Sequence, residues 1–306
     1  MRAEFIQALA DLAETNPQIL LLTADIGYTV LEPFADRFPK RFFNVGVAEQ
    51  NMVGMATGLA REGFVPFLYS IVNFAALRPY EFIRNGPVHH QLPVRIIGVG
   101  EAFDYGPAGI THYGLEDVGV MRLQPGLTVV VPADGQQTKT ALEKTWDLPG
   151  PIYYRLGKGT KSPVPGLSAR FELGRLQSLR DGKDFVFVCM GSVSRVVLEA
   201  AEELAKKGVK GGIVLVSSFN PAPVGELLSV LFHYPLAVTV EEHYLTGALG
   251  SLVCEVIAEN RLPCRVVRCG VSSLLKKTLG SRNFMLQSQG LSADKLVATV
   301  LNTIGK

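Results

Sequence analysis

The chain of 306 residues has little net charge, and no segment of it is dominated by charge of one sign. The formal net charge is +2, and there is no run of lysine and arginine interleaved with aromatic residues, which argues against a nucleic-acid ligand. No stretch approaches the roughly 20 consecutive apolar residues that span a bilayer, and the amphipathic first residues are unlike a signal peptide. We therefore expect neither a nucleic-acid partner nor a membrane.

Cysteine is scarce: Cys189, Cys254, Cys264 and Cys269 are the four in the chain. No two of them form a C-x-x-C pair, and all but Cys264 lie beside or within apolar strand-like or helix-like runs. This pattern favours free thiols in a reducing cytoplasm over disulfides or a metal site. We predict a cytoplasmic protein without metal ligands of its own.

The first half of the chain alternates short apolar runs with helical patterns. Apolar residues make up 47% of the chain, which is enough for a large core, and the length suits two domains. A helix through Phe5, Leu9 and Ala13 opens the chain. Strands are expected at 19–23, 65–69, 94–99 and 127–131, and helices at 50–61, 75–85, 115–122 and 134–146. Such alternation predicts a parallel sheet covered by helices on both faces.

The pattern breaks after residue 156 and later restarts. Residues 157–182 are rich in glycine and proline without a sustained period, which is typical of a linker with room for one short strand. Beyond it, strands are expected at 184–190, 212–216, 236–240 and 264–268, and helices at 194–207, 247–258 and 292–303. The expected fold class is α/β, with two three-layer domains of mostly parallel sheets at 1–160 and 181–306, joined by a linker at 161–180.

One glutamate stands at the start of an expected helix, in the string Asn44-Val-Gly-Val-Ala-Glu49-Gln-Asn-Met52. Taken alone, Glu49 suggests a simple helix start, because the helix dipole stabilises a carboxylate there. The Gly46 turn, the Gln-Asn pair and the apolar helix that follows form a more specific string. It strongly resembles the transketolase family and its relative 1-deoxyxylulose-5-phosphate synthase.

Later landmarks resemble the same family in the same order and extend the resemblance over nearly the whole chain. They are Thr111-His112 with Glu116-Asp117-Val118, Pro125-Gly-Leu-Thr-Val-Val-Val-Pro-Ala-Asp134, and Val240-Glu-Glu-His243 with Gly247-Ala-Leu-Gly-Ser251. The resemblance implies a thiamine diphosphate enzyme with a pyrimidine-binding domain followed by a transketolase C-terminal domain.

In the family, the glutamate at the position of Glu49 contacts the aminopyrimidine ring of the cofactor. A carboxyl group in a mostly apolar site can share a proton with ring nitrogen N1′, which activates the 4′-amino group as a base. We therefore expect Glu49 to bind the cofactor and to activate it.

The resemblance implies further cofactor contacts. Phe74, by its spacing to Arg78, matches the aromatic residue that stacks on the pyrimidine, although a core phenylalanine is the competing interpretation. Ile71 stands where the family has a second aromatic residue. Asp25 stands where relatives carry an acidic residue near the cofactor, and an aspartate that caps a turn is the alternative.

The substrate side involves His112, Arg78 and Lys158. In the family, the histidine of the Thr-His motif lies near the reacting carbon, and imidazole is suited to proton transfer to an alkoxide. Arg78 matches an arginine that holds a sugar phosphate or closes the substrate channel; a solvated surface arginine is the alternative. Lys158 stands where relatives often have a phosphate-binding arginine, whose planar fork lysine lacks.

Two family features are missing. No Gly-Asp-Gly followed by a downstream asparagine pair occurs, and in the superfamily that element holds Mg²⁺ and the diphosphate. The chain therefore looks like the C-terminal half of a transketolase. We expect a partner subunit that carries the diphosphate-binding domain with Mg²⁺, in an α2β2 assembly.

The loop at 98–112 is also atypical. Sugar-phosphate transketolases usually have a histidine near position 100 and an acidic residue near position 108, where this chain has Gly100 and Ala108. A site without a hydrogen-bonding group cannot select strongly for a substrate hydroxyl, which favours a deoxy or modified sugar. The alternative is that Asp104 replaces the missing acid.

The expected reaction is transfer of a two-carbon ketol unit from a ketose phosphate to an aldehyde. The alternatives are the beta chain of a 2-oxo acid dehydrogenase, an enzyme like 1-deoxyxylulose-5-phosphate synthase, and a non-catalytic paralogue. The string Thr111-His-Tyr-Gly-Leu-Glu-Asp117 favours transketolase over the dehydrogenase, and Glu49 argues against a non-catalytic protein.

Overall fold

The computed structural model describes residues 1–159, 162–273 and 279–306. The first half contains α1 (Arg2–Thr15), β1 (Ile19–Thr23), α2 (Glu32–Arg37), β2 (Phe42–Asn44), α3 (Glu49–Arg61), β3 (Val65–Ile71), α4 (Val72–Ala76), α5 (Tyr80–Ile83), β4 (Arg95–Val99), α6 (Asp117–Arg122), β5 (Thr128–Val130), α7 (Gly135–Thr145) and β6 (Ile152–Leu156). A π-helical turn (Arg84–Val88) follows α5, and two 3₁₀ turns (Gly106–Ala108 and Ile110–His112) lie between β4 and α6.

The second half contains β7 (Leu176–Arg180), β8 (Phe185–Cys189), α8 (Ser194–Lys206), β9 (Gly211–Val216), β10 (Ser218–Asn220), α9 (Val224–His233), β11 (Leu236–Tyr244), α10 (Leu249–Asn260), β12 (Arg265–Val271), α11 (Arg282–Ser288) and α12 (Ala293–Ile304). A 3₁₀ turn (Gly191–Val193) leads into α8.

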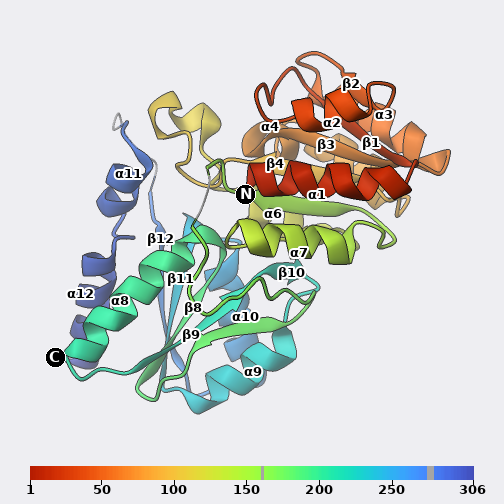
Figure 1. The fold of residues 1–306 in the computed structure, drawn as a ribbon. Helices are drawn as coiled ribbons and strands as arrows, with labels where there is room; N and C mark the ends of the chain where they lie inside the picture. The colour runs from red at the N-terminus through yellow and green to blue at the C-terminus, as the bar shows by residue number, and fades with distance from the viewer. Residues whose placement is uncertain (160–161, 274–278) are drawn as a thin grey trace.

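Two sheets organise these elements (Figure 1). The strand order is β10-β5-β6-β4-β3-β1-β2 in the first sheet and β12-β11-β8-β9-β7 in the second. Neighbouring strands are parallel, except that β10 is antiparallel to β5 and β7 is antiparallel to β9. The predicted fold class of two α/β domains with mostly parallel sheets is confirmed.

Alternation along β1 shows how the apolar strands fill both faces of the first sheet. Ile19 and Leu21 pack in the cluster that includes residues of α1 and α7, whereas Leu20 and Leu22 pack in the cluster that includes α3. Successive side chains of a strand point to opposite faces, so a strand covered by helices on both sides must be apolar throughout. Figure 1 shows α1 and α7 side by side over one face of this sheet.

The helix predicted at 75–85 is wrong as a continuous element. The structure instead has two short helices, α4 and α5, followed by the π-helical turn. Pro79 lies between α4 and α5, and proline lacks the N–H that a helix interior needs and disfavours helical backbone at the preceding residue.

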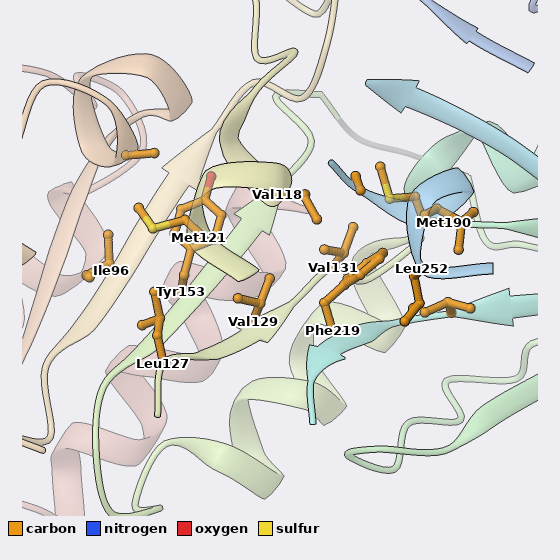
Figure 2. Packing of buried hydrophobic residues seen from close by; sticks show 14 of the residues in the cluster. Ile96, Val118, Met121, Leu127, Val129, Val131, Tyr153, Met190, Phe219 and Leu252 are labelled. Atoms are coloured by element: carbon orange, nitrogen blue, oxygen red, sulfur yellow. The ribbon is translucent and has the colours of Figure 1, made fainter. Parts of the chain in front are cut away.

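The two halves of the chain share one core. Strand β10 comes from the second half, yet it pairs with β5 at the end of the first sheet. Figure 2 shows Val131 and Phe219 close to Met190 and Leu252, and Met121 lies farther off beside Tyr153 in the same cluster. The predicted boundary at residues 160 and 161 lies outside the described residues.

Within the described ranges, no helix is long and apolar enough to cross a bilayer. The four cysteines are free thiols, of which Cys189 and Cys264 are buried.

Candidate active site

The predicted site residues follow the carboxyl ends of neighbouring parallel strands. In the first sheet, β6, β4, β3 and β1 are adjacent and parallel, so their carboxyl ends share one edge. Asp25 follows β1, Phe74 and Arg78 follow β3, the loop with His112 follows β4, and Lys158 follows β6. This edge is where ligands bind in open α/β sheets.

Glu49 is buried at the first position of α3, with its side chain 2% exposed. Nη1 of Arg78 donates a hydrogen bond to Oε2 of Glu49 at 2.5 Å. The chain approaches α3 through Gly46, whose φ of +73° suits glycine, and the Gly46 N–H donates to Oδ1 of Asn44 at 3.0 Å. The break at Pro79 and this turn together bring the two charged groups into contact.

Aromatic contacts continue from this ion pair. The guanidinium carbon of Arg78 lies 4.3 Å from the ring centroid of Phe74. The His112 ring meets Phe74 edge-on, with ring centroids 5.3 Å apart and an interplanar angle of 71°. Nδ1 of His112 lies 2.9 Å from the Thr111 hydroxyl, which helps to fix the orientation of the imidazole ring.

Beyond His112 the contacts pass to Tyr105 and Lys158. The ring centroids of Tyr105 and His112 are 5.9 Å apart, and Nζ of Lys158 lies 4.3 Å from the Tyr105 ring centroid. Glu49, Arg78, Phe74, His112, Tyr105 and Lys158 thus follow one another in contact, and we call these six residues the contact row. It has a carboxylate at one end, an imidazole in the middle and an ammonium at the other end.

Among the described residues, no hydrogen bond, ion pair or ring contact joins Asp25 or Ile71 to the contact row. Oδ1 of Asp25 accepts hydrogen bonds from the Tyr28 hydroxyl at 2.7 Å and from Nδ2 of Asn44 at 3.0 Å. The Tyr28 bond, together with the Asn44 bond, lowers the pKa of Asp25. Ile71 ends β3 and is 5% exposed. The contacts of Asp25 are those of a turn that ties the end of β1 to β2.

Asp104 is engaged within the chain. Its Oδ2 accepts the Lys158 backbone N–H at 2.7 Å, and its Oδ1 lies 3.3 Å from Nε of Arg282 in the second domain. Arg282 also donates to the Ser192 hydroxyl at 2.9 Å and pairs with Glu242. Both Asp104 oxygens therefore have partners, and the carboxylate positions Lys158 rather than pointing away from the protein.

Sequence reasoning missed Arg2, Thr29 and Tyr105. Arg2 and Thr29 line a cavity of about 350 Å³ together with Lys158. The sequence assigns Arg2 only to an amphipathic helix, and nothing in the local pattern signals that α1 begins next to the segment after β6. Two cations beside one cavity form a place where an anionic group can bind.

Several of the later landmarks join the two domains. Oδ2 of Asp117 accepts from the Tyr153 hydroxyl at 2.8 Å and from Nε of Arg155 at 2.9 Å. Nη2 of Arg155 also donates to the Glu242 carbonyl at 2.9 Å. Arg155 and Asp117 are both fully buried, so this pair depends on these hydrogen bonds to compensate for lost solvation.

His243 lies at the same contact between the domains, and Glu241 precedes it in β11. Nε2 of His243 accepts the Gly119 N–H at 3.2 Å. Its Nδ1 therefore carries the proton and donates to the Tyr244 carbonyl oxygen at 2.7 Å. Burial lowers the pKa of His243 and keeps the ring neutral. Glu241 accepts the first N–H groups of α10, and burial raises its pKa to about 7.

The residues fit one end of thiamine diphosphate. Glu49 presents a buried carboxyl group, of which Arg78 holds one oxygen, and Phe74 provides a ring beside it. For the diphosphate end, the described residues contain no group of three or more His, Cys, Asp or Glu able to hold a metal ion.

Comparison with known proteins gives a consistent assignment. Residues 1–161 match the family described as "Transketolase, pyrimidine binding domain", and residues 174–296 match "Transketolase, C-terminal domain". A protein of Methanocaldococcus jannaschii named "Putative transketolase C-terminal section" is 32% identical over 100% of this chain and 96% of its own length. An apulose-4-phosphate transketolase subunit of Phocaeicola vulgatus is 30% identical over 100% of this chain and 97% of that protein.

A solved structure described as a split gene transketolase in an inactive beta4 tetramer superposes with a TM-score of 0.89. It is 36% identical in sequence, and the match covers 98% of this chain and 97% of that one. Transketolases depend on thiamine diphosphate. The chain belongs to the transketolase family and spans its pyrimidine-binding and C-terminal domains.

Proposed function

We propose that this chain is the C-terminal subunit of a split transketolase, which transfers a two-carbon ketol unit from a ketose to an aldehyde. The observation that carries the proposal is the contact row, which begins at a buried glutamate on a helix start and lies in a chain without Gly-Asp-Gly. The similar proteins, named as a transketolase section and a transketolase subunit, support it.

At the cofactor end, Glu49 holds the pyrimidine N1′ with the carboxyl oxygen that Arg78 leaves available. Phe74 packs on the ring, and Ile71 adds apolar surface at the end of β3. Asp25 contacts the cofactor from the turn after β1. When bound, thiamine diphosphate supplies the carbanion chemistry of ketol transfer. The protein residues orient the ring and hold the proton at N1′.

At the substrate end, His112 moves a proton to and from the substrate oxygen next to the reacting carbon. Lys158 and Arg2 bind the anionic terminus of a sugar phosphate in the cavity that they line. Arg78 helps to keep the substrate channel closed over Phe74. Because Asp104 is engaged by Arg282 and Lys158, we assign it to positioning, and we infer that the substrate is a modified sugar.

A partner subunit completes the site with the diphosphate-binding domain and Mg²⁺. Large apolar side chains stay exposed after β1, on β2, just before Glu49 and on α3: Tyr28 at 68%, Phe43 at 38%, Val47 at 72% and Met55 at 38%. Exposed apolar surface at an incomplete site is typical of a protein interface. We propose an α2β2 assembly of cytoplasmic location, which the free thiols favour.

We further propose domains at residues 1–160 and 181–306 with a linker at 161–180. Strand β7 lies within this linker and begins the pairing with β9 in the second sheet.

The test compares the purified chain with the chain co-purified with a partner that contains Gly-Asp-Gly. We expect Mg²⁺-dependent thiamine diphosphate binding and ketol transfer only in the complex. Glu49→Ala in the complex should abolish transfer without dissociating the subunits. Tight, Mg²⁺-dependent cofactor binding by the isolated chain would contradict the split-subunit proposal.

A further inference from the structure

The loop after β4 carries a side chain that fills the space above a glycine. Gly100 has a φ of +93°, and a Cβ atom built there would overlap Cε2 of Tyr105. No side chain fits at position 100 while Tyr105 holds this place. The position of the Tyr105 ring therefore requires glycine at position 100, where no hydrogen-bonding side chain can be present.

Tyr105 occupies the contact row between the imidazole and the ammonium. Its ring lies between His112, at 5.9 Å between ring centroids, and Nζ of Lys158, at 4.3 Å from the ring centroid. A substrate that reaches from His112 to the Lys158 cavity passes this ring. Burial is the main cause that raises the pKa of Tyr105, so the phenol stays protonated at neutral pH.

The second domain holds this loop in place. A Cβ atom on Gly106 would overlap the Gly280 carbonyl oxygen, so the segment that precedes α11 packs directly on the residue after Tyr105. The Tyr113 hydroxyl donates to the Gly106 carbonyl at 2.7 Å, and Arg282 pairs with Asp104 on the other side of Tyr105. The ring is therefore pre-oriented rather than free to swing away from a substrate.

We propose that Tyr105 determines substrate specificity in the proposed ketol transfer, by presenting a ring face to the carbons between the reacting carbon and the anionic terminus. This inference rests on the proposed function. The face of an aromatic ring selects a substrate by its shape, whereas a hydrogen-bonding group selects a substrate that carries a hydroxyl group. Gly100 and Ala108 offer no side-chain donor or acceptor, so the Tyr105 face accepts carbons that carry hydrogen or a carbon branch where ordinary pentose phosphates carry a hydroxyl.

The experiment uses the reconstituted complex and two acceptor aldehydes, ribose 5-phosphate and 2-deoxyribose 5-phosphate, with xylulose 5-phosphate or the complex's own ketose as donor. For the wild-type complex, we expect kcat/KM values for the two acceptors within about tenfold of each other. Tyr105→Phe keeps the ring and should keep this ratio. Tyr105→Ala removes the ring face and should shift the ratio toward ribose 5-phosphate by about tenfold.

Phe103→Leu is the matched control, because Phe103 is an aromatic residue of the same loop that is fully buried against Tyr113. It should lower the melting temperature and leave the acceptor ratio unchanged. A wild-type preference for ribose 5-phosphate above about a thousandfold, or an unchanged ratio in an active Tyr105→Ala complex, overturns the role of Tyr105. Absence of transfer with every donor and acceptor overturns the proposed function itself, and with it this inference.

Discussion

The pair formed by Glu49 and Arg78 combines a buried carboxylate with a partly exposed arginine. The Glu49 side chain is 2% exposed and that of Arg78 is 37% exposed. Solvent screening weakens such a pair relative to one buried on both sides. Loss of the arginine nevertheless leaves a buried carboxylate without its charged donor, which is the costlier part of the change.

We predict that Arg78→Gln destabilises the isolated chain by about 1 kcal/mol. Glu49→Gln removes the charge that needs compensation, so the double variant should lose less stability than the two single variants together. Urea unfolding of the wild-type chain and the three variants measures this coupling. Additive losses would show that the two side chains do not stabilise one another in solution.

At the residue scale, the sequence pointed to most of the contact row but not to all of it. Glu49, Arg78, Phe74 and His112 came from the family resemblance, and the structure brings them together. Tyr105 carried no signal, because its position matters only after the loop folds back over Gly100. The same holds for the side chains that α1 brings to the Lys158 cavity.

At the scale of elements, most apolar strands were predictable, whereas some short or interrupted elements were not. The strands β3, β4 and β8 are continuous buried runs, and the sequence placed each of them, as it did the three-residue strand β5. Strands β2 and β10, which also have three residues each, and the helix α9 were not predicted. The pairing of β10 with β5 depends on tertiary contacts that no local pattern encodes.

The beginning of α11 belongs to the second domain and contacts the first domain. Arg282 is the first residue of α11, and it joins Asp104 to Glu242. Because Asp104 holds the backbone N–H of Lys158, loss of Arg282 should loosen Lys158 without touching the reacting carbon. Arg282 is thus a positioning residue for the anion cavity.

We predict that Arg282→Gln in the complex raises KM for a sugar phosphate by about tenfold, with a smaller fall in kcat. Arg282→Lys should recover part of the KM, because it keeps the charge and loses the planar fork. Initial-rate kinetics with a phosphorylated acceptor and glycolaldehyde, which lacks the phosphate, separates the two effects. An equal rise in KM for both acceptors would argue against a role at the anion cavity.

At the scale of the whole molecule, the two domains are joined by a common hydrophobic core and by buried ionisable side chains. His243 and Glu241 are both buried in β11, and burial shifts their pKa values in opposite senses. The lowered pKa of His243 makes stability fall as pH drops below the value of a free imidazole. The raised pKa of Glu241 makes stability fall as pH rises from about 4.5 to about 7, because the folded state binds the extra proton in that window. The two contributions have opposite signs in the wild-type chain.

Substitution of Glu241 separates its contribution to the pH dependence of stability from that of His243. Glu241→Gln removes the ionisable group and retains an oxygen that can accept one N–H at the start of α10. The loss of the second acceptor is independent of pH, whereas the cost of a buried charge appears only above pH 4.5 and is complete above about pH 7. The melting temperature of the variant relative to wild type should therefore rise between about pH 5 and about pH 8.

Glu259→Gln, at an exposed position of α10, is the control and should show no such trend. A constant difference between Glu241→Gln and wild type across this range would mean that Glu241 titrates as an ordinary carboxyl group, and that the start of α10 is accessible to water.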